Sequence, residues 1–249
     1  MLLAVLSDVH ANLPALRLVL ADVRKKHVDK VVCLGDVVGL HTHPAECIDL
    51  LRSENVFCIL GNHDAGVIGR LQRKSFPADC WEVIEWTRSM LTADQMNYLS
   101  TLPPQALIDE SIWVMHGYFE NVSRYMVGTM RILLAASRLK IRSIPLGFYG
   151  HTHTVSAHVI DGVPPFAGIH SVSPLNVRPD RKSVTLCNPG TVGQPRDADA
   201  CTRYLTYDSE RTEVMFHRIE YDYASVVKET LAHFPHHAPF YAGFAKRSP

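Results

Sequence analysis

The sequence predicts an α/β protein built from two β-sheets with helices on the outside. Two observations lead to this prediction. In residues 1–60, short apolar runs of strand length alternate with helical patterns, and such β-α-β-α-β alternation is typical of a parallel sheet joined by right-handed crossovers. Beyond residue 150, short apolar runs are separated by Gly, Pro, Asp and Asn, which is typical of antiparallel strands. We expect these later runs to form mostly a second sheet.

The first 60 residues contain the clearest element boundaries. Asn12 offers a side-chain cap for the first helix, and Lys25 and Lys26 carry the charge that a helix C-terminus favours. The elements expected here, in chain order, are a strand at 2–6, a helix up to 25–26, a strand at 31–34, a helix at 44–51 and a strand at 56–60.

Residues 65–101 change to a helical pattern, which we interpret as an excursion over the site at the strand ends. Thr92 followed by Gln95 is a capping-box signature, and Pro103-Pro104 ends the excursion. The later elements expected are a strand at 112–115, a helix at 130–139, an apolar run ending at 150, strands at 155–160, 164–169, 183–186, 204–207 and 214–218, and a helix at 221–233. We predict a single domain over residues 1–233 and a C-terminal arm at 234–249.

Charge and cysteine usage restrict the class of protein. Lys plus Arg equals Asp plus Glu, at 25 each, so the net charge gives no reason to expect a nucleic-acid or other polyanionic partner. No run is long and apolar enough to span a membrane, and the N-terminus lacks a signal-peptide pattern. The six cysteines show no C-x-x-C spacing. These features are typical of a cytoplasmic protein with reduced thiols.

Polar side chains follow five of the apolar runs, at the point where each run ends. The five motifs are Ser7-Asp8-Val9-His10, Gly35-Asp36, Gly61-Asn62-His63-Asp64, His116-Gly117 and Gly150-His151-Thr152-His153. Because open α/β sheets place ligand sites at the carboxyl ends of their strands, we expect these side chains to converge. Each motif alone is more often a turn or a helix cap, but five at successive strand ends indicate one site.

The donor types in these motifs predict a metal site. Mixed imidazole, carboxylate and amide ligands suit Mn, Fe, Zn, Ni or Co better than Ca or Mg, and the carboxylate of Asp36 can be shared by two cations. Asp8 and His10 are separated by one residue, as are His151 and His153. In an extended segment this spacing puts both side chains on one side, so each pair could hold one metal ion.

The ordered set of motifs resembles the calcineurin-like metallophosphoesterases, and within them the small bacterial and archaeal phosphodiesterase-like (YfcE-like) branch. The resemblance runs from residue 1 to about residue 208 and includes the loop Asn188-Pro189-Gly190-Thr191-Val192-Gly193-Gln194-Pro195-Arg196. It implies a four-layer α/β/β/α sandwich of two mixed sheets flanked by helices, in agreement with the two sheets expected from the sequence pattern.

The resemblance also implies roles for individual residues. Asp8, His10, Asp36 and His153 would bind one divalent transition metal ion, and Asp36, Asn62, His116 and His151 would bind the other. A hydroxide bridging the two ions would attack phosphorus in line with the leaving group. His63 would contact a phosphate oxygen or protonate the leaving group, and Asp64 would orient its imidazole.

Several residues around these motifs are candidates for substrate contacts. Arg196 could bind a phosphate oxygen together with Asn62 and His63, or pair with a neighbouring aspartate instead. His41 follows Gly39 in a loop that could face the substrate or only solvent. Gly39 and Asp64 depart from the patterns of the protein serine/threonine phosphatase and dinucleoside tetraphosphatase branches, which are therefore disfavoured.

We therefore expect a dinuclear metal-dependent hydrolase acting on a small phosphodiester or phosphomonoester, such as a nucleotide. The complete ligand set and the presence of His63 favour catalysis over the alternative of a non-catalytic protein-interaction scaffold of the same fold. A nuclease is the other alternative, and the lack of a basic stripe makes small substrates the better expectation. The sequence predicts no particular oligomeric state.

Overall fold

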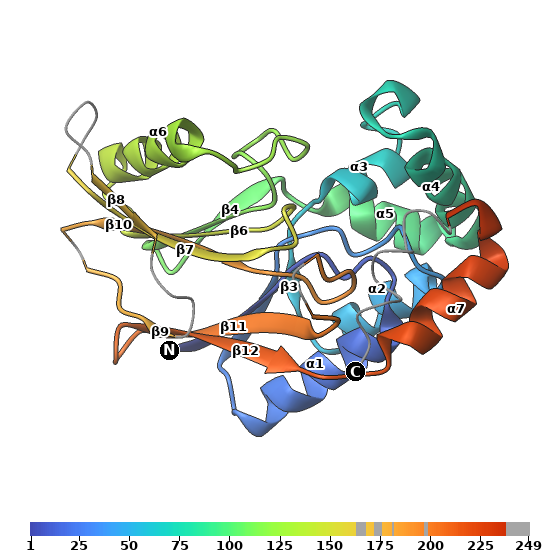
Figure 1. Ribbon diagram of the computed structural model, residues 1–249, viewed down its shortest axis with the longest axis horizontal. Coiled ribbons are helices and arrows are strands. Elements are labelled where there is room, and N and C mark those ends of the chain that lie inside the picture. Colours follow the sequence, from blue (N-terminus) through green and yellow to red (C-terminus); the bar gives the residue numbers. More distant parts are fainter. Residues whose placement is uncertain (163–167, 172–175, 181, 197–198, 238–249) are drawn as a thin grey trace.

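The computed structural model describes residues 1–162, 168–171, 176–180, 182–196 and 199–237 (Figure 1). The helices are α1 (Leu13–Lys25), α2 (Pro44–Ser53), α3 (Asn62–Val67), α4 (Ala78–Met90), α5 (Ala93–Thr101), α6 (Thr129–Ile141) and α7 (Tyr223–His233), with short 3-10 helices η1 (Arg73–Ser75) and η2 (Pro235–His237). The strands are β1 (Leu2–Leu6), β2 (Lys30–Cys33), β3 (Phe57–Cys58), β4 (Gln105–Ile108), β5 (Ile112–Met115), β6 (Leu146–Tyr149), β7 (Val155–Asp161), β8 (Gly168–Ser171), β9 (Asn176–Val177), β10 (Val184–Pro189), β11 (Thr202–Asp208) and β12 (Glu213–Ile219).

These strands form two mixed six-stranded sheets. The first has the order β3-β2-β1-β11-β12-β9, and the second has the order β4-β5-β6-β10-β7-β8. In the first sheet β1, β2 and β3 are parallel, as the β-α-β-α-β pattern predicts, while β11 runs antiparallel to β1. In the second sheet β5, β6 and β10 are parallel and the other neighbours are antiparallel.

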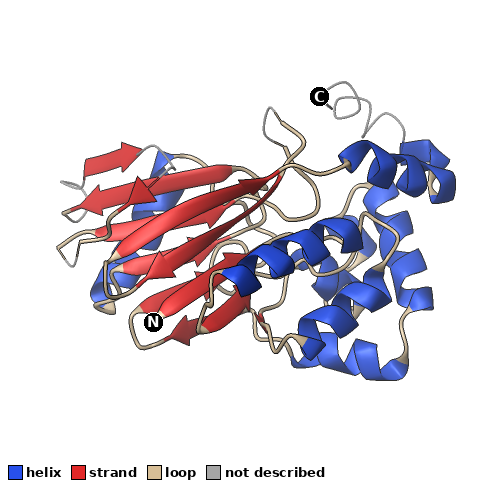
Figure 2. Cartoon of the chain, turned by 90° about the horizontal axis from the view of Figure 1, so that it is seen from below, coloured by secondary structure: helices blue, strands red, loops and turns tan. Residues whose placement is uncertain are grey.

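Three separate apolar clusters show that the sheets and helices form four layers (Figures 1 and 2). Between the two sheets, residues such as Val5 and Leu34 from the first pack with Phe148 from the second. The outer face of the first sheet packs against α1 and α2, and the outer face of the second packs against α6. The predicted α/β/β/α sandwich of two mixed sheets flanked by helices is confirmed.

Local sequence signals explain where several helices begin. The side chain of Asn12 accepts a hydrogen bond from the backbone N–H of Ala15 at 3.1 Å and caps α1, as predicted. Thr92 and Gln95 form the predicted capping box at the start of α5. Such caps satisfy amide groups that the first helical turn leaves without an intrahelical partner.

The assignment of the last strands to a second sheet is wrong for β11 and β12. Both lie in the first sheet, where β11 pairs with β1 in the register Leu3↔Tyr207. The sequence pattern is local and carries no information on which distant strand a given strand joins. The edge strand β4 directly follows Pro103-Pro104 and was not expected, and the strand expected at 164–169 lies largely outside the described residues.

The helical excursion expected at 65–101 is in contact with the segment that follows α7. It comprises α3, η1, α4 and α5 and lies at one end of the sandwich, beside α7 (Figure 1). Residues 234–237 were expected to begin a surface arm, but Phe234 is buried and its ring lies 5.2 Å from that of Trp86 in α4. The rest of the predicted arm, residues 238–249, lies outside the described residues.

Two further expectations concern the state of the cysteines and the absence of a membrane-spanning segment. All six cysteines are free and five of them are buried. Within the part of the chain that the structure describes, none of the helices combines the length and the apolar character needed to cross a membrane.

Candidate metal centre

The seven predicted metal ligands meet at one end of the sandwich, where strands of both sheets end. Asp8 and His10 follow β1, Asp36 follows β2, Asn62 begins α3, His116 follows β5, and His151 and His153 follow β6. All seven residues are buried, and none is more than 6 % exposed. The structure therefore brings together every residue that the sequence predicted as a ligand.

Most of these ligands have an unusual backbone conformation. Positive φ angles of 51–66° occur at Asp8, His10, Asp36, His151 and His153. Residues other than glycine rarely adopt this region, which costs roughly 1–3 kcal/mol per residue and is found mainly at functional sites. Backbone hydrogen bonds between the loops maintain it, among them His10 N–H to the Asp36 carbonyl at 2.8 Å.

Glycines in the motifs allow the strand ends to approach one another. A β-carbon on Gly61 would lie 2.1 Å from the amide nitrogen and from Oδ1 of Asp36. A β-carbon on Gly150 would lie 2.1 Å from the hydroxyl oxygen of Ser7 and 3.0 Å from Oδ2 of Asp8. Real β-carbons do not make such contacts, so these two positions require glycine for the carboxylates to reach the centre.

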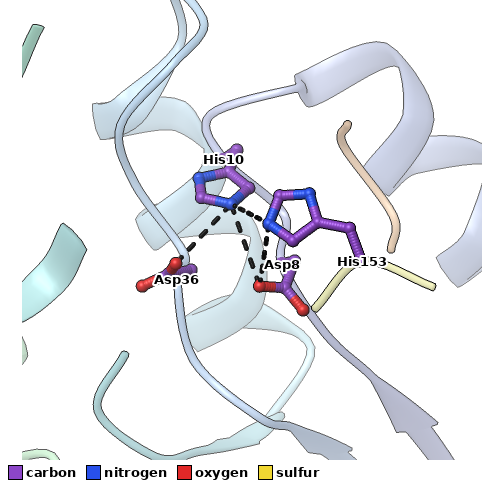
Figure 3. Close-up of side chains that lie close together, drawn as sticks. All are labelled: Asp8, His10, Asp36 and His153. Atoms are coloured by element: carbon purple, nitrogen blue, oxygen red, sulfur yellow. Dashed lines mark hydrogen bonds and ion pairs between the residues drawn. The ribbon is translucent and has the colours of Figure 1, made fainter. Parts of the chain in front are cut away.

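The first cluster comprises Asp8, His10, Asp36 and His153, whose ligand atoms point toward one another (Figure 3). Nε2 of His10 lies 3.0 Å from Nε2 of His153, and the latter lies 3.3 Å from Oδ1 of Asp8. Nε2 of His10 also lies 3.6 Å from Oδ2 of Asp36. These separations are those of atoms that share one cation at about 2.0–2.2 Å each.

The second cluster comprises Asp36, His116 and His151, with ligand atoms within 4.8 Å of one another. Nε2 of His116 lies 3.3 Å from Oδ2 of Asp36 and 3.1 Å from Oδ1 of Asn62. Asn62 therefore adds an amide oxygen to the three titratable ligands. Asp36 belongs to both clusters, as expected of a bridging carboxylate.

Each carboxylate uses one oxygen for hydrogen bonds and directs the other to the clusters. Oδ1 of Asp36 accepts from the backbone N–H of His63 at 2.8 Å, while Oδ2 has no hydrogen-bond partner within the described structure. In Asp8, Oδ2 accepts from the Ser7 hydroxyl and from the His151 N–H, while Oδ1 has no such partner there. A buried carboxylate oxygen without a hydrogen bond is costly unless a cation neutralises it.

The imidazoles of His116 and His153 are oriented so that Nε2 faces these oxygens. Nδ1 of His116 lies 2.7 Å from the Leu34 carbonyl, and Nδ1 of His153 lies 2.9 Å from the Gln194 carbonyl. Because a carbonyl only accepts, each Nδ1 donates a proton to it, so Nε2 is the nitrogen that remains to bind a metal ion. Imidazole nitrogens and carboxylate oxygens that face one another can bind a common cation, so the donor set fits divalent transition metals.

The pKa values of the histidines in the centre are shifted by burial and by the negative charge of Asp36. Burial lowers the pKa of His151 to about 3, and it holds the pKa of His10 well below its usual range. Burial also opposes protonation of His116, but the charge of Asp36 outweighs it and raises the pKa of His116 to about 9, so a metal ion that binds Nε2 of His116 must displace a proton. A buried neutral imidazole such as that of His10 is the form in which histidine binds a metal.

One expectation from the sequence, that two residues separated by a single position bind the same metal ion, is wrong for His151 and His153. His151 and His153 were expected to hold the same ion, yet His153 belongs to the first cluster and His151 to the second. The argument assumed an extended segment, whereas positive φ angles at both residues turn the chain between them. The division implied by the family resemblance is the one that the structure has.

A cleft of about 420 Å³ opens onto the two clusters. His63 lines it without belonging to either cluster, and its ring lies edge-on to His10 at a centroid distance of 4.8 Å. Arg196, predicted as a substrate contact, also lines the cleft and is exposed. Phe76 and Tyr125 contribute aromatic walls.

Two predicted site residues have other contacts. His41 is 1 % exposed and does not line the cleft, because its ring nitrogens face the Thr230 hydroxyl at 2.8 Å and the Gly193 carbonyl at 3.2 Å. Asp64 was expected to orient His63, but its carboxylate accepts from the backbone N–H groups of Gly61 and Val38. As the third residue of α3, Asp64 fixes the loop around the site instead of the imidazole.

The structure adds residues that sequence reasoning missed. The Ser123 carbonyl lies 3.2 Å from Nε2 of His151, so that nitrogen donates and Nδ1 carries the lone pair. Nδ1 of His63 is buried without a hydrogen-bond partner among the described residues. Backbone carbonyls leave no signal in a sequence, so the contact of Ser123 could not be predicted.

Comparison with known proteins identifies relatives across almost the whole chain. A family model described as the calcineurin-like phosphoesterase superfamily domain matches residues 1–212. The uncharacterized protein MJ0912 of Methanocaldococcus jannaschii is 30 % identical over 239 residues, covering 92 % of this chain and 93 % of its own.

Two solved structures have a similar fold. The metallophosphoesterase from Sphaerobacter thermophilus is 33 % identical with a TM-score of 0.73, and the match covers 94 % of this chain and 95 % of that one. The hypothetical protein PH1004 from Pyrococcus horikoshii is 19 % identical with a TM-score of 0.72, and the match covers 94 % and 93 % of the two chains.

Proposed function

The chain belongs to the calcineurin-like phosphoesterase superfamily, and we propose that it hydrolyses a small phosphodiester or phosphomonoester with the help of two divalent transition metal ions. One observation carries the proposal. Oδ2 of Asp36 is buried without a hydrogen bond among the described residues and faces His10 of one cluster and His116 of the other. Two adjacent cation sites with a shared carboxylate are typical of enzymes that displace groups at phosphorus.

The ligand sets for the two ions are the ones described above. Asp8, His10, Asp36 and His153 would hold one ion, and Asp36, Asn62, His116 and His151 would hold the other. Mn, Fe, Zn, Ni and Co suit this mixture of nitrogen and oxygen donors. When bound, such ions would supply Lewis acidity, which makes water more acidic and neutralises charge on phosphoryl oxygens.

His63 supplies the proton that the leaving group needs. Hydrolysis of a phosphodiester consumes one water and yields a monoester and an alcohol, so the oxygen of the leaving alcohol must gain a proton. Nδ1 of His63 is buried against Gly39, which leaves Nε2 as the nitrogen available to a molecule in the cleft. General-acid catalysis by a positioned histidine typically contributes about 10²- to 10⁴-fold to the rate.

Two further groups in the cleft suit the phosphoryl oxygens. The guanidinium of Arg196 lines the cleft and is exposed, so it can approach an anionic ester with its fork of donors. Oδ1 of Asn62 faces the second cluster, which leaves the amide N–H₂ to donate to a phosphoryl oxygen. These donors bind the charge that both ester classes share, so they favour neither class.

The test combines metal analysis with turnover. Protein treated with a chelator and reloaded with Mn²⁺ is assayed with bis-p-nitrophenyl phosphate and p-nitrophenyl phosphate. We expect release of p-nitrophenolate that depends on the metal and that Asp36→Asn abolishes. Asp94→Asn, which alters an exposed carboxylate paired with Arg52, is the matched control. Protein that holds two ions per chain and releases p-nitrophenolate from neither ester would overturn the proposal.

A further inference from the structure

The cleft is too large for a phosphoryl group alone. Its volume of about 420 Å³ lies within the range of about 300–1,000 Å³ that is usual for pockets binding whole small molecules. Beyond the metal ligands, much of its wall is apolar, with Leu40 and Phe76 among the lining residues. A ligand that fills the cleft must therefore carry organic groups as well as phosphate.

Tyr125 provides one aromatic wall beside the second cluster. Its ring stacks on His151 with a centroid distance of 3.9 Å and an interplanar angle of 16°. Tyr125 lines the cleft, and 41 % of the residue is exposed. Its carbonyl accepts a hydrogen bond from the Arg131 guanidinium at 2.6 Å, which ties this loop to α6. An aromatic ring held in this way offers a flat surface for a second ring.

Phe76 provides another aromatic wall, beside the proton donor. Its ring lies 5.7 Å from that of His63 at an interplanar angle of 71° and also packs against Trp81 in α4. The two aromatic walls thus flank the metal clusters at His63 and at His151. A phosphodiester likewise has two ester groups, one on either side of its phosphorus.

Ser123 lies beside Tyr125 and faces the same cleft. Its hydroxyl oxygen is buried and has no hydrogen-bond partner among the described residues. An unpaired buried hydroxyl is unfavourable unless a ligand completes its hydrogen bonds. A phosphoryl oxygen in the cleft would be a suitable acceptor for this hydroxyl.

The two other aromatic residues of this loop do not share the position of Tyr125. Phe119 is fully buried in the cluster beneath α6, and Tyr118 lines a different surface cavity. Within the described part of this loop, Tyr125 is therefore the aromatic residue that lines the cleft.

We propose that Tyr125 forms a subsite for an aromatic ring on the ester group that stays bound to phosphorus after hydrolysis. This inference rests on the proposed function. Because His63 protonates the leaving oxygen, the leaving group lies on the side of His63 and Phe76, and the retained group lies on the side of His151 and Tyr125. The preferred substrate class is a phosphodiester whose retained alcohol carries an aryl ring or nucleobase, with the Ser123 hydroxyl donating to a phosphoryl oxygen.

The kinetic test uses two diesters that share a leaving group. Methyl p-nitrophenyl phosphate and phenyl p-nitrophenyl phosphate both release p-nitrophenolate and differ in the retained group. The readout is the ratio of kcat/KM for the phenyl ester to that for the methyl ester. We expect Tyr125→Ala to lower this ratio by roughly 3- to 10-fold, the effect of one aromatic contact, and Tyr125→Phe to preserve it. Leu134→Ala, an exposed residue of α6 outside the cleft, is the control.

The same ratio separates a subsite from a purely structural role. If the Tyr125 ring only orients His151, then Tyr125→Ala lowers turnover of both esters equally, and an unchanged ratio overturns the inference. A second readout needs no turnover: calorimetry of phenylphosphonate and methylphosphonate binding to the metal-loaded protein. Tyr125→Ala is expected to weaken phenylphosphonate selectively, again by roughly 3- to 10-fold.

The two readouts also distinguish failure of the inference from failure of the proposed function. Absence of hydrolysis of both diesters, with metals bound, overturns the proposed function, and the binding ratio then still tests the subsite. Hydrolysis of both diesters with a ratio that does not depend on the Tyr125 ring overturns the subsite and leaves the proposed function standing.

Discussion

The backbone of Gly39 lies directly against the imidazole of His63. A β-carbon on Gly39 would be 2.6 Å from Nδ1 of His63 and 3.1 Å from its Cγ. Gly39 also has a φ of +87°, which side chains other than that of glycine disfavour. The loop after β2 therefore provides Asp36, which belongs to both candidate metal clusters, and three residues later it sets the position of the His63 ring.

We predict that Gly39→Ala lowers kcat while the metal content stays at the wild-type value. The added methyl group must push the His63 ring aside, because a contact of 2.6 Å is shorter than real β-carbons make. Displacement of a general acid by about 1 Å can reduce the rate by about 10²-fold. The measurements are elemental analysis of the purified variant and kcat with diphenyl phosphate, because phenolate is a poorer leaving group than p-nitrophenolate and depends more on a proton donor.

Gly69→Ala is the matched control for this variant. Gly69 has a similar φ of +80°, but a β-carbon there would meet nothing within 4 Å. Both variants incur the backbone strain of a positive φ, and Gly39→Ala alone meets the ring. Equal kcat values in the two variants would mean that strain, and not displacement of His63, accounts for any loss.

The residues of the candidate metal centre could be predicted to lie together because the signal for them is local. Each of these residues directly follows or begins an element whose apolar pattern is readable, as in Asp8 after β1 and Asp36 after β2. The partner of β1 on its other side could not be predicted. Leu3 pairs with Tyr207, and two strands separated by about 200 residues leave no local pattern that indicates their pairing.

The sequence also did not predict where the side chains of His41 and Asp64 point. His41 lies two residues after Gly39, but its ring is buried against Gly193 and α7. Asp64 follows His63, but its carboxylate binds backbone amides at the start of α3. The two side chains diverge from the cleft because Asp64 satisfies backbone N–H groups and His41 satisfies a buried hydroxyl and a carbonyl.

We predict that His63→Ala abolishes turnover without releasing the metals. His63 belongs to neither ligand cluster, so the loss should be confined to proton donation and amount to about 10²- to 10⁴-fold in kcat. Measured kcat and metal content decide this, with His170→Ala at an exposed histidine as the control. Turnover close to wild type would remove His63 from the mechanism and favour a different proton donor.

Metal stoichiometry should distinguish the shared ligand from the others. Asp36 contributes to both clusters, whereas His153 contributes to the first alone. We predict that Asp36→Asn reduces the metal content toward zero and that His153→Ala reduces it toward one ion per chain. Elemental analysis after dialysis gives both values. Loss of the same number of ions in both variants would contradict a carboxylate shared between two sites.

Metal removal should destabilise the fold. Without cations, Oδ1 of Asp8 and Oδ2 of Asp36 remain buried without a hydrogen bond among the described residues and face only histidine nitrogens. Because an ion that binds only the folded state stabilises it by mass action, a concentration of 1,000 times Kd adds about 4 kcal/mol. We predict a lower Tm after chelation that Mn²⁺ restores. The Asp36→Asn variant should lack this shift, and a shift of wild-type size there would place the stabilising ion elsewhere.

His41 supports the fold and does not contact the substrate, so its replacement should affect stability rather than KM. Its ring joins the Thr230 hydroxyl of α7 to the Gly193 carbonyl from a position that is 1 % exposed. His41→Ala removes one hydrogen bond from each of these buried groups, which keep their bonds to Val226 and Asn12, at a cost of about 0.5–1.5 kcal/mol per hydrogen bond. We therefore predict that urea denaturation shows a free energy of unfolding lower by about that amount per bond, with an unchanged KM for bis-p-nitrophenyl phosphate. A several-fold rise in KM at unchanged stability would instead place His41 at the substrate.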